Sequence, residues 1–274
     1  MGDCGKIVSL ILNVLLLVVD IVLIVCYFVV SKDEITHVVP PVSHDQVIPI
    51  TGKYYMDKIE GPAAAQFQYD HLDSKYYTMH DFYNMKSEGS LKILSNYRTY
   101  QQTSELSCGC CCIIMAADYT EKDTSISERR CSDIAGTNES GTTPENLMHV
   151  LDTMNYDYEA NVGGPNGNPF NDYKSFRTWV QKSIDDGYPI IVCCNDLGGH
   201  YITIIGIDTL GTDETYDDVL IFADPYDNTD HRQDGYNVWE LERFYDLWAV
   251  PLDLLTDREH ASFRYIQVKG KKAQ

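Results

Sequence analysis

The sequence predicts an α+β fold in which a central helix packs on an antiparallel sheet, preceded by a single N-terminal transmembrane helix. Three observations predict it: a long apolar segment near the N-terminus, helical patterns between residues 108 and 187, and short β-branched runs after them. Helices followed by antiparallel strands are typical of the α+β class. We expect an anchor over residues 1–34, a stalk and tyrosine-rich segment over 35–92, and a globular domain over 93–274.

The apolar segment runs from Ile7 to Val30. As a helix it would be about 36 Å long, enough to cross a hydrocarbon core of about 30 Å. No A-x-A-like cleavage site follows it, which favours an uncleaved anchor in the lipid bilayer. Asp20 lies at mid-span, where it either marks a partner or is a carboxylate tolerated in a single-span anchor. Flanking charges barely discriminate orientation, so we expect a single-pass protein of the cell membrane with its domain extracytoplasmic, as in signal-anchors.

The chain of 274 residues carries 41 acidic and 21 basic side chains, a formal charge of −20. A surface of this sign repels nucleic acid and anionic lipid, so polyanion binding is excluded. The charge serves solubility, with attraction of cationic substrates as the alternative. The apolar fraction of 44% is enough for a real core.

Nine cysteines are many for this length, and two of them, Cys4 and Cys26, fall in the anchor segment. None of the cysteines forms a C-x-x-C pair matched by a second pair or by histidines at zinc spacing, so we expect no metal site. Most of them should serve as small buried hydrophobes. The seven that follow the anchor are Cys108, Cys110, Cys111, Cys112, Cys131, Cys193 and Cys194.

The helices of the domain are predicted from their starts and stops. The run CGCCCIIMAADY is apolar on every side, as a central buried helix should be, and it begins at Cys108. Thr143 suits the N-cap of a second helix and Pro144 its first position. A third helix is expected from about Tyr173, with Gly187 as its stop. The runs PIIVCC, HYITIIGID and VLIFAD then predict three strands separated by turns.

Cys108 is the candidate nucleophile. It stands at the head of the buried helix, where unpaired N–H groups and the helix dipole stabilise a thiolate. Gly109 lets the backbone pass close to a substrate carbonyl. A cysteine at a helix start is weak evidence by itself, because most such residues are inert.

His200 is the candidate general base among eight histidines. It alone opens a strongly apolar strand, directly after the Gly198-Gly199 turn, which holds an imidazole on a rigid element. His149 lies within a helix and is read as a packing residue.

The two strands that follow bring a carboxylate to His200. If HYITIIGI and VLIFAD are antiparallel neighbours, pairing Ile207 with about Asp217 places residue 200 opposite about residue 224. Asp224 can then accept a hydrogen bond from the imidazole and fix its tautomer. The alternative is that Asp224-Pro225 only begins a turn.

An amide for the oxyanion hole is offered by Gln102, six residues before Cys108, with Gln101 as the near competitor. Spacing alone does not separate the two.

Taken together, QQTSELSCG, GYPIIVCCNDLGGHYITIIGID and LIFADPYD resemble the C39-like peptidases, a branch of the papain-like superfamily. The resemblance extends from about Tyr97 to Trp248. It implies a papain-like cysteine-peptidase fold with Cys108, His200 and Asp224 as the catalytic residues, and it favours Gln102 over Gln101. It also implies a helix near WELERFYDLW.

The sequence departs from that family at CGCCC, where relatives usually carry Cys-Gly-Pro-Ala or Cys-Gly-Ala-Ala. Neighbouring thiols could oxidise onto Cys108 or replace it, with Cys110 as the rival nucleophile. The best-known role of the family is cleavage after Gly-Gly in leader peptides, by domains fused to ABC exporters. One apolar span rather than six, and no G-x-x-x-x-G-K-[ST] motif, argue against that role here.

The expected function is therefore cleavage of a peptide or protein substrate through a thioester acyl-enzyme, without metal or organic cofactor. Two alternatives remain: an acyltransferase or amidase using the same triad, and a non-catalytic surface module whose cleft holds peptides. The position of the tyrosine-rich segment also allows it to be an autoinhibitory cover.

Overall fold

The structure is a computed structural model, and clustering of its contacts gives two compact units, Met1–Val39 and Pro40–Gln274. Almost all of the predicted membrane segment lies outside the described residues. Within the described part of the chain, no helix is both long and apolar enough to cross a membrane. The structure describes residues 18–19, 46–49, 56, 58–65, 68, 70–162, 168–194, 198–250 and 263–273.

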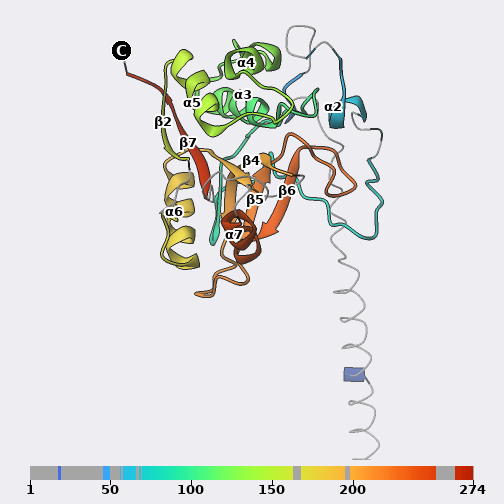
Figure 1. Cartoon of the computed structure of the whole chain (residues 1–274). Coiled ribbons are helices and arrows are strands. Elements are labelled where there is room, and N and C mark those ends of the chain that lie inside the picture. Colours follow the sequence, from blue (N-terminus) through green and yellow to red (C-terminus); the bar gives the residue numbers. More distant parts are fainter. Residues whose placement is uncertain are drawn as a thin grey trace, which may run out of the picture. The chain divides into compact units, whose positions relative to one another are not determined.

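The second unit is an α+β domain built on one antiparallel sheet, as predicted (Figure 1). Its helices are α2 (Gly61–Ala65), α3 (Cys108–Glu121), α4 (Glu128–Ala135), α5 (Pro144–Thr153), α6 (Tyr173–Asp185) and α7 (Leu241–Ala249). Its strands are β1 (Leu91–Ile93), β2 (Tyr156–Asn161), β3 (Ile190–Cys194), β4 (His200–Asp208), β5 (Val219–Ala223), β6 (Tyr236–Glu240) and β7 (Arg264–Lys271).

The strands lie in the order β2-β7-β3-β4-β5-β6, and every neighbouring pair is antiparallel. The short strand β1 pairs with residues 206–208 of β4, beyond the part of β4 that pairs with β3. The three strands predicted from β-branched runs are therefore the adjacent strands β3, β4 and β5. β7, the last strand in sequence order, inserts between β2 and β3.

The predicted helix boundaries are confirmed. Thr143 is the N-cap of α5 and accepts a hydrogen bond from the backbone N–H of Asn146, and Pro144 occupies the first turn. α6 begins at Tyr173 behind a capping box formed by Asp172 and Ser175. The chain leaves α6 through Gly187, whose φ of 81° is a left-handed conformation that glycine adopts without strain.

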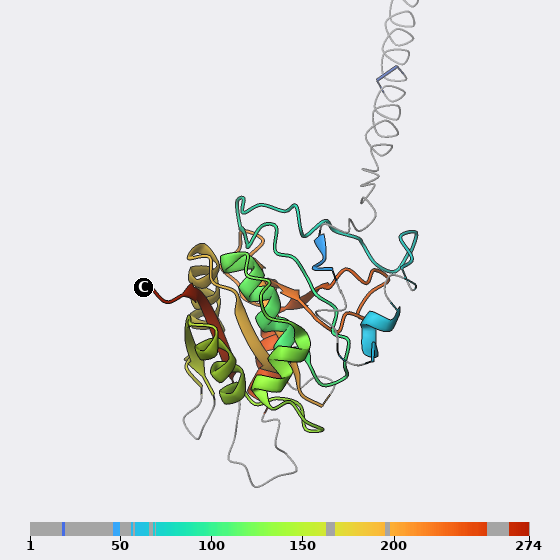
Figure 2. The same ribbon diagram turned by 90° about the horizontal axis from the view of Figure 1, so that it is seen from above.

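Both faces of the central strands are covered, because every residue of β3 and all but the last of β4 are buried. On one face α3 contacts Tyr201: a Cβ added to Gly109 would come 3.1 Å from the Tyr201 ring. Phe222 pairs with Ile204, so it points to the opposite face, where its ring lies 4.9 Å from that of Phe244 in α7. Figure 2 shows α3, in green, beside the strands it covers.

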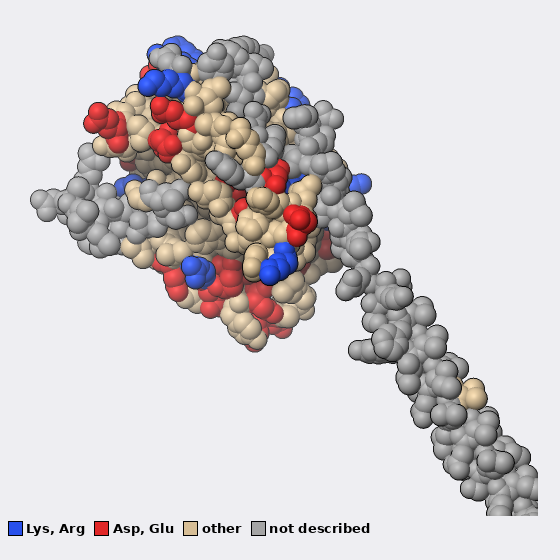
Figure 3. All heavy atoms as spheres, turned by 90° about the vertical axis from the view of Figure 1, so that its right-hand side faces the viewer, with Lys and Arg blue, Asp and Glu red and all other residues tan. Residues whose placement is uncertain are grey.

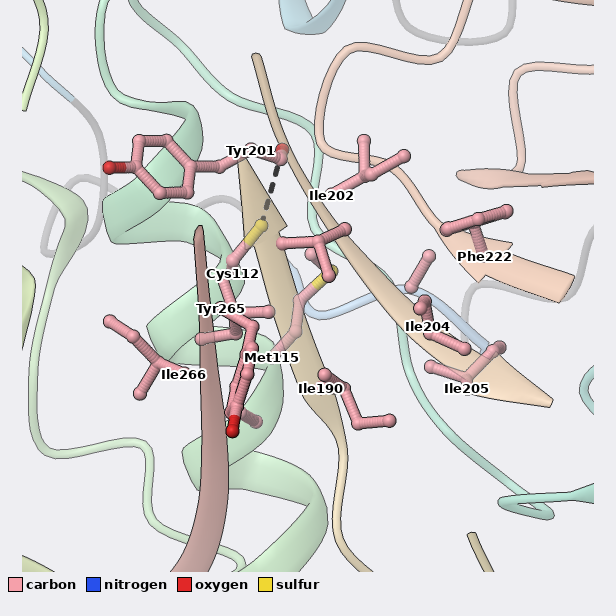
Figure 4. Close-up of a cluster of buried hydrophobic side chains, with 14 of the residues drawn as sticks. Cys112, Met115, Ile190, Tyr201, Ile202, Ile204, Ile205, Phe222, Tyr265 and Ile266 are labelled. Carbon is pink, nitrogen blue, oxygen red and sulfur yellow. Dashed lines mark hydrogen bonds between the residues drawn. The ribbon is translucent and has the colours of Figure 1, made fainter. Parts of the chain in front are cut away.

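The small thiols of α3 make close packing on the sheet possible. Cys112 is buried, and its Sγ donates to the Tyr201 carbonyl of β4 at 3.3 Å (Figure 4). Met115 lies about one turn further along α3 and is fully buried against the sheet in the same view. A helix that is apolar on every side is therefore the core element that the sequence predicted.

Parts of the predicted stalk and tyrosine-rich segment belong to the same compact unit as the sheet. Ile48 donates its backbone N–H to the Thr99 carbonyl at 2.7 Å. His71 donates its backbone N–H to the His231 carbonyl, also at 2.7 Å, and Phe82 packs against the ring of Tyr236. These described residues are thus built into the domain surface.

The negative charge is spread over the domain. On the face shown in Figure 3, acidic side chains lie in several places with basic side chains between them. Some of these charges are paired across elements, as in the 2.9 Å ion pair between Lys92 and Asp185.

Candidate active site

Cys108 is the first residue of α3 and is half-buried. The Ser107 side chain makes no capping hydrogen bond to the helix. The first i→i−4 hydrogen bond runs from the Cys111 N–H to the Ser107 carbonyl at 3.0 Å, so the amide of Cys108 precedes the helical ladder. The thiol thus lies at the end of a helix that offers positive partial charge and donor groups.

His200 is the first residue of β4 and is buried, and the Cys108 side chain is one of the groups that raise its pKa. Burial lowers the pKa of His200, but the negative charge of Asp224, the hydrogen bond to that carboxylate and the contact with Cys108 outweigh it. The result is a pKa raised from 6.5 to about 10. The imidazole is therefore a stable imidazolium beside the thiol at neutral pH.

Asp224 follows β5 directly and forms a hydrogen bond with the His200 imidazole. Its Oδ1 lies 2.7 Å from His200 Nε2 and also accepts the backbone N–H of Tyr226 at 2.8 Å. Its Oδ2 accepts the Asn237 side-chain amide at 2.9 Å. Because Nε2 is engaged with Asp224, Nδ1 is the ring nitrogen left for Cys108.

The strand register predicted from the sequence was wrong by two to three residues. Ile207 pairs with Leu220 instead of about residue 217, and Thr203 pairs with Ala223. A β-bulge between Ile204 and Gly206 adds the last residue of the shift. In this register Asp224 lies diagonal to His200 on the same side of the strand pair, and the side chains still span the gap.

Gln102 is fully buried beside the site, but its side chain has a different partner from the one expected. Its Nε2 donates to the Ser104 carbonyl at 2.6 Å, and its Oε1 has no hydrogen-bond partner among the described residues. Its backbone is fixed on both sides, by the Pro225 carbonyl at 2.9 Å and the Ala63 N–H at 3.3 Å. One N–H of the amide remains for an oxyanion.

Gln101, the competitor of Gln102, has a separate role that the sequence did not indicate. Its Nε2 donates to the Asp224 carbonyl at 2.9 Å, and its Oε1 accepts the Asp227 N–H at 3.1 Å. Both ends of this amide are used to hold the turn that follows Asp224. Asn237 was also missed, because a lone asparagine in the polar run GYNVWE carries no local signal.

The other thiols of the CGCCC run are buried and are not among the groups that raise the pKa of His200. Cys110 is fully buried and lies 3.8 Å from the Thr137 hydroxyl, while a hydrogen bond with Cys131 lowers its pKa. Burial raises the pKa of Cys111 and of Cys112 well above the ordinary value. Cys108 is therefore the thiol of this run that meets an imidazole. Among the described residues, no group of His, Cys, Asp or Glu side chains could hold a metal ion.

A cavity of about 340 Å³ lies between α2 and the turn that follows Asp224. Tyr226 forms part of its wall, and the Tyr226 ring also stands edge-on to His200 with the centroids 6.3 Å apart. Gly61, Pro62 and Ala65 of α2 line it as well.

The sequence model described as "Peptidase_C39 like family" matches residues 94–249, which is more than half of the chain. The match includes Gln102, Cys108, His200 and Asp224. No curated protein gives a significant match.

Three solved peptidase domains are among the structures that this chain resembles. The peptidase domain of Streptococcus ComA, described as a bi-functional ABC transporter involved in a quorum sensing pathway, is 16% identical with a TM-score of 0.42. That comparison covers 64% of this chain and 99% of the other. A double glycine motif protease from an AMS/PCAT transporter, in complex with the leader peptide, is 13% identical with a TM-score of 0.38, covering 62% and 89%. The Streptococcus mutans ComA peptidase domain is 13% identical with a TM-score of 0.35, covering 63% and 98%.

Proposed function

Because the chain belongs to the Peptidase_C39 like family, we propose that it is a cysteine peptidase that cleaves peptide bonds with Cys108 as nucleophile and His200 as general base. One observation carries the proposal: the His200 imidazole lies 2.7 Å from Asp224, and the half-buried Cys108 thiol at the start of α3 is close enough to raise its pKa. A nucleophile, its base and a third group that orients the base are the parts required for acyl transfer.

The reaction begins when the Cys108 thiolate attacks the carbonyl carbon of a peptide bond. The carbonyl oxygen takes up the negative charge and is stabilised by the free N–H of Gln102 and the backbone N–H of Cys108. His200 then gives its proton to the leaving amine, and a thioester to Cys108 remains. Water, deprotonated by His200, hydrolyses the thioester and restores the thiol.

The same residues support a second reaction class. If an amine in place of water attacks the thioester, the protein is an acyltransferase, and if the substrate is a non-peptide amide, it is an amidase. A third reading is a peptide-binding module that does not cleave. The three readings differ in the products formed, so one assay separates them.

The test uses the full-length chain in detergent, a peptide library and mass spectrometry. New peptide termini in the wild type, absent in Cys108→Ala, support the peptidase; new amide-linked products support the acyltransferase; bound but intact peptide supports the binding module. Iodoacetamide should label Cys108 rapidly near neutral pH, because a thiolate is the reacting form. Cys110→Ala is the matched control and should cleave as the wild type does. Cleavage by Cys108→Ala would reject this nucleophile.

We also propose that residues 7–30 anchor the protein in the cell membrane, with the domain extracytoplasmic. The support is the sequence: an apolar stretch long enough to span, followed by no cleavage site. The protein should stay in the membrane pellet after extraction with alkaline carbonate, whereas a chain starting at residue 40 should be released. Protection of the domain from protease added to intact cells would reject the orientation.

A further inference from the structure

Glu128 is a buried carboxylate that the proposed reaction does not use. It is the first residue of α4, and its side chain is fully shielded from solvent. A carboxylate is costly to bury unless hydrogen bonds replace its water shell. The hydrogen-bond donors around Glu128 therefore show which part of the chain this carboxylate holds.

Four donors surround the two oxygens of Glu128. Oε2 accepts the hydroxyls of Tyr100 at 3.0 Å and Thr103 at 2.7 Å. Oε1 accepts the Thr103 backbone N–H at 2.9 Å and the Ser107 hydroxyl at 2.5 Å. Four hydrogen bonds fill the acceptor capacity of a carboxylate. All four come from one segment, residues 100–107.

This segment carries both halves of the proposed acyl-transfer machinery. Gln102 lies next to Thr103, whose backbone and side chain are both bound to Glu128. Ser107 immediately precedes Cys108 and is the N-cap residue of α3. One carboxylate therefore fixes the amide donor and the nucleophile to the same point.

We infer that Glu128 is a positioning residue, which sets the spacing between the Gln102 amide and the Cys108 thiol. This inference rests on the proposed function. The N-terminus of α4 offers positive partial charge to the Glu128 carboxylate. Charge-assisted hydrogen bonds are stronger and shorter than neutral ones, which suits a group that must hold a geometry.

The position of Glu128 affects peptide cleavage and thiol alkylation differently. Cleavage needs an oxyanion donor at the right distance, whereas alkylation by iodoacetamide needs only the thiolate and its imidazolium. Misplacing a catalytic group by about 1 Å can cost about 100-fold in rate. We expect Glu128→Ala to lower kcat for cleavage about 100-fold, with KM and the alkylation rate of Cys108 changed less than about threefold.

Glu128→Gln is the milder variant. Its remaining side-chain oxygen can still accept hydrogen bonds from the Thr103 N–H and the Ser107 hydroxyl. The hydroxyls of Tyr100 and Thr103 must turn so that they accept from the NH2 group of the new amide. We expect kcat to fall about tenfold. Asp118→Asn is the matched control, because Asp118 is also a buried carboxylate but lies near the far end of α3 in a salt bridge with Arg98. It should lower the melting temperature and leave kcat at the wild-type value below melting.

Hydrogen–deuterium exchange tests the contacts without any substrate. In Glu128→Ala, exchange of peptides covering residues 100–107 should rise about tenfold or more, and in Asp118→Asn it should not. A wild type that alkylates but never cleaves would reject the proposed function and leave this readout to decide on Glu128. Unchanged exchange over 100–107, or cleavage and alkylation lost in equal proportion in folded protein, would overturn the inference.

Discussion

His200 and Asp224 lie 2.7 Å apart at Nε2 and Oδ1 although they are not direct partners across the sheet. They are diagonal neighbours of β4 and the end of β5, so the contact depends on side-chain reach and on the turn that carries Asp224. The groups that hold this turn should therefore influence catalysis as strongly as the strands do.

Asp224→Asn should move the alkaline limit of activity to lower pH. The pKa of His200 is about 10, mainly because the charge of Asp224 overcomes burial, and the active imidazolium is lost as the pH rises through that value. Without the carboxylate charge, burial dominates and lowers the pKa of His200. The alkaline limit of activity then falls with it. The rate of peptide cleavage between pH 6 and 11 measures it. An unchanged alkaline limit would contradict the assignment of Asp224.

The same pKa predicts how stability depends on pH. A histidine whose folded pKa lies above its unfolded value of about 6.5 contributes stability fully below pH 6.5, and loses that contribution as the pH rises to about 10. His200→Gln should flatten the decline in unfolding free energy across this window. Urea denaturation at pH 6, 8 and 10 checks it; parallel declines in both proteins would refute it.

Asn237→Ala should lower kcat about tenfold, because Asp224 Oδ2 loses the amide that donates to it at 2.9 Å. The carboxylate can then turn away from His200. Steady-state kinetics should show KM changed little. Asn237→Asp is the informative comparison, since it places a second carboxylate beside Asp224 and should be worse than alanine. Wild-type activity in both variants would mean that Asn237 has no influence on the pair formed by His200 and Asp224.

Gln102→Ala and Gln101→Ala should separate by their effects. Removing an oxyanion donor costs about 100- to 1000-fold in kcat, and we expect this from Gln102→Ala, with a smaller fall in melting temperature than from Gln101→Ala because one hydrogen bond, to Ser104, is lost. Gln101→Ala breaks two hydrogen bonds to the turn at Asp224 and Asp227, so it should lower the melting temperature as well as kcat. The reverse pattern would exchange the two roles.

Gly206→Ala should destabilise the domain by about 1–3 kcal/mol without touching the site. A Cβ at this position would come 2.9 Å from the Lys92 carbonyl of β1 and 3.3 Å from the Ile221 side chain. Strand β1 would have to shift away from β4. The midpoint of urea unfolding measures the loss, and an unchanged midpoint would show that β1 moves at no cost.

Local patterns explain what the sequence could predict. Thr143-Pro144 specifies a helix start by itself, and the apolar run after Cys108 specifies a buried helix. The neighbouring strands β4 and β5 are joined by a short connection, so their pairing and the approach of Asp224 to His200 were within reach of the sequence.

Other features depend on contacts between distant residues. The bulge beside Gly206 forms where β1 and β5 both pair with β4, which no local pattern indicates. Glu128 stands in the polar run SERRC and reads as a surface residue, yet it is buried because residues 100–107 fold over it. The side chain of Gln102 turns to Ser104 for a similar reason: the loop closes on itself.

The place of β7 has a consequence for synthesis of the protein. Residues 1–263 must be made before β7, yet β7 supplies the strand between β2 and β3 and packs beneath α3. Until the ribosome has delivered residues 264–271, the sheet stays in two pieces and the nucleophile helix lacks part of its support. Domains begin to fold while they are being made. In a growing chain the proposed active site should therefore be complete only after translation has passed β7.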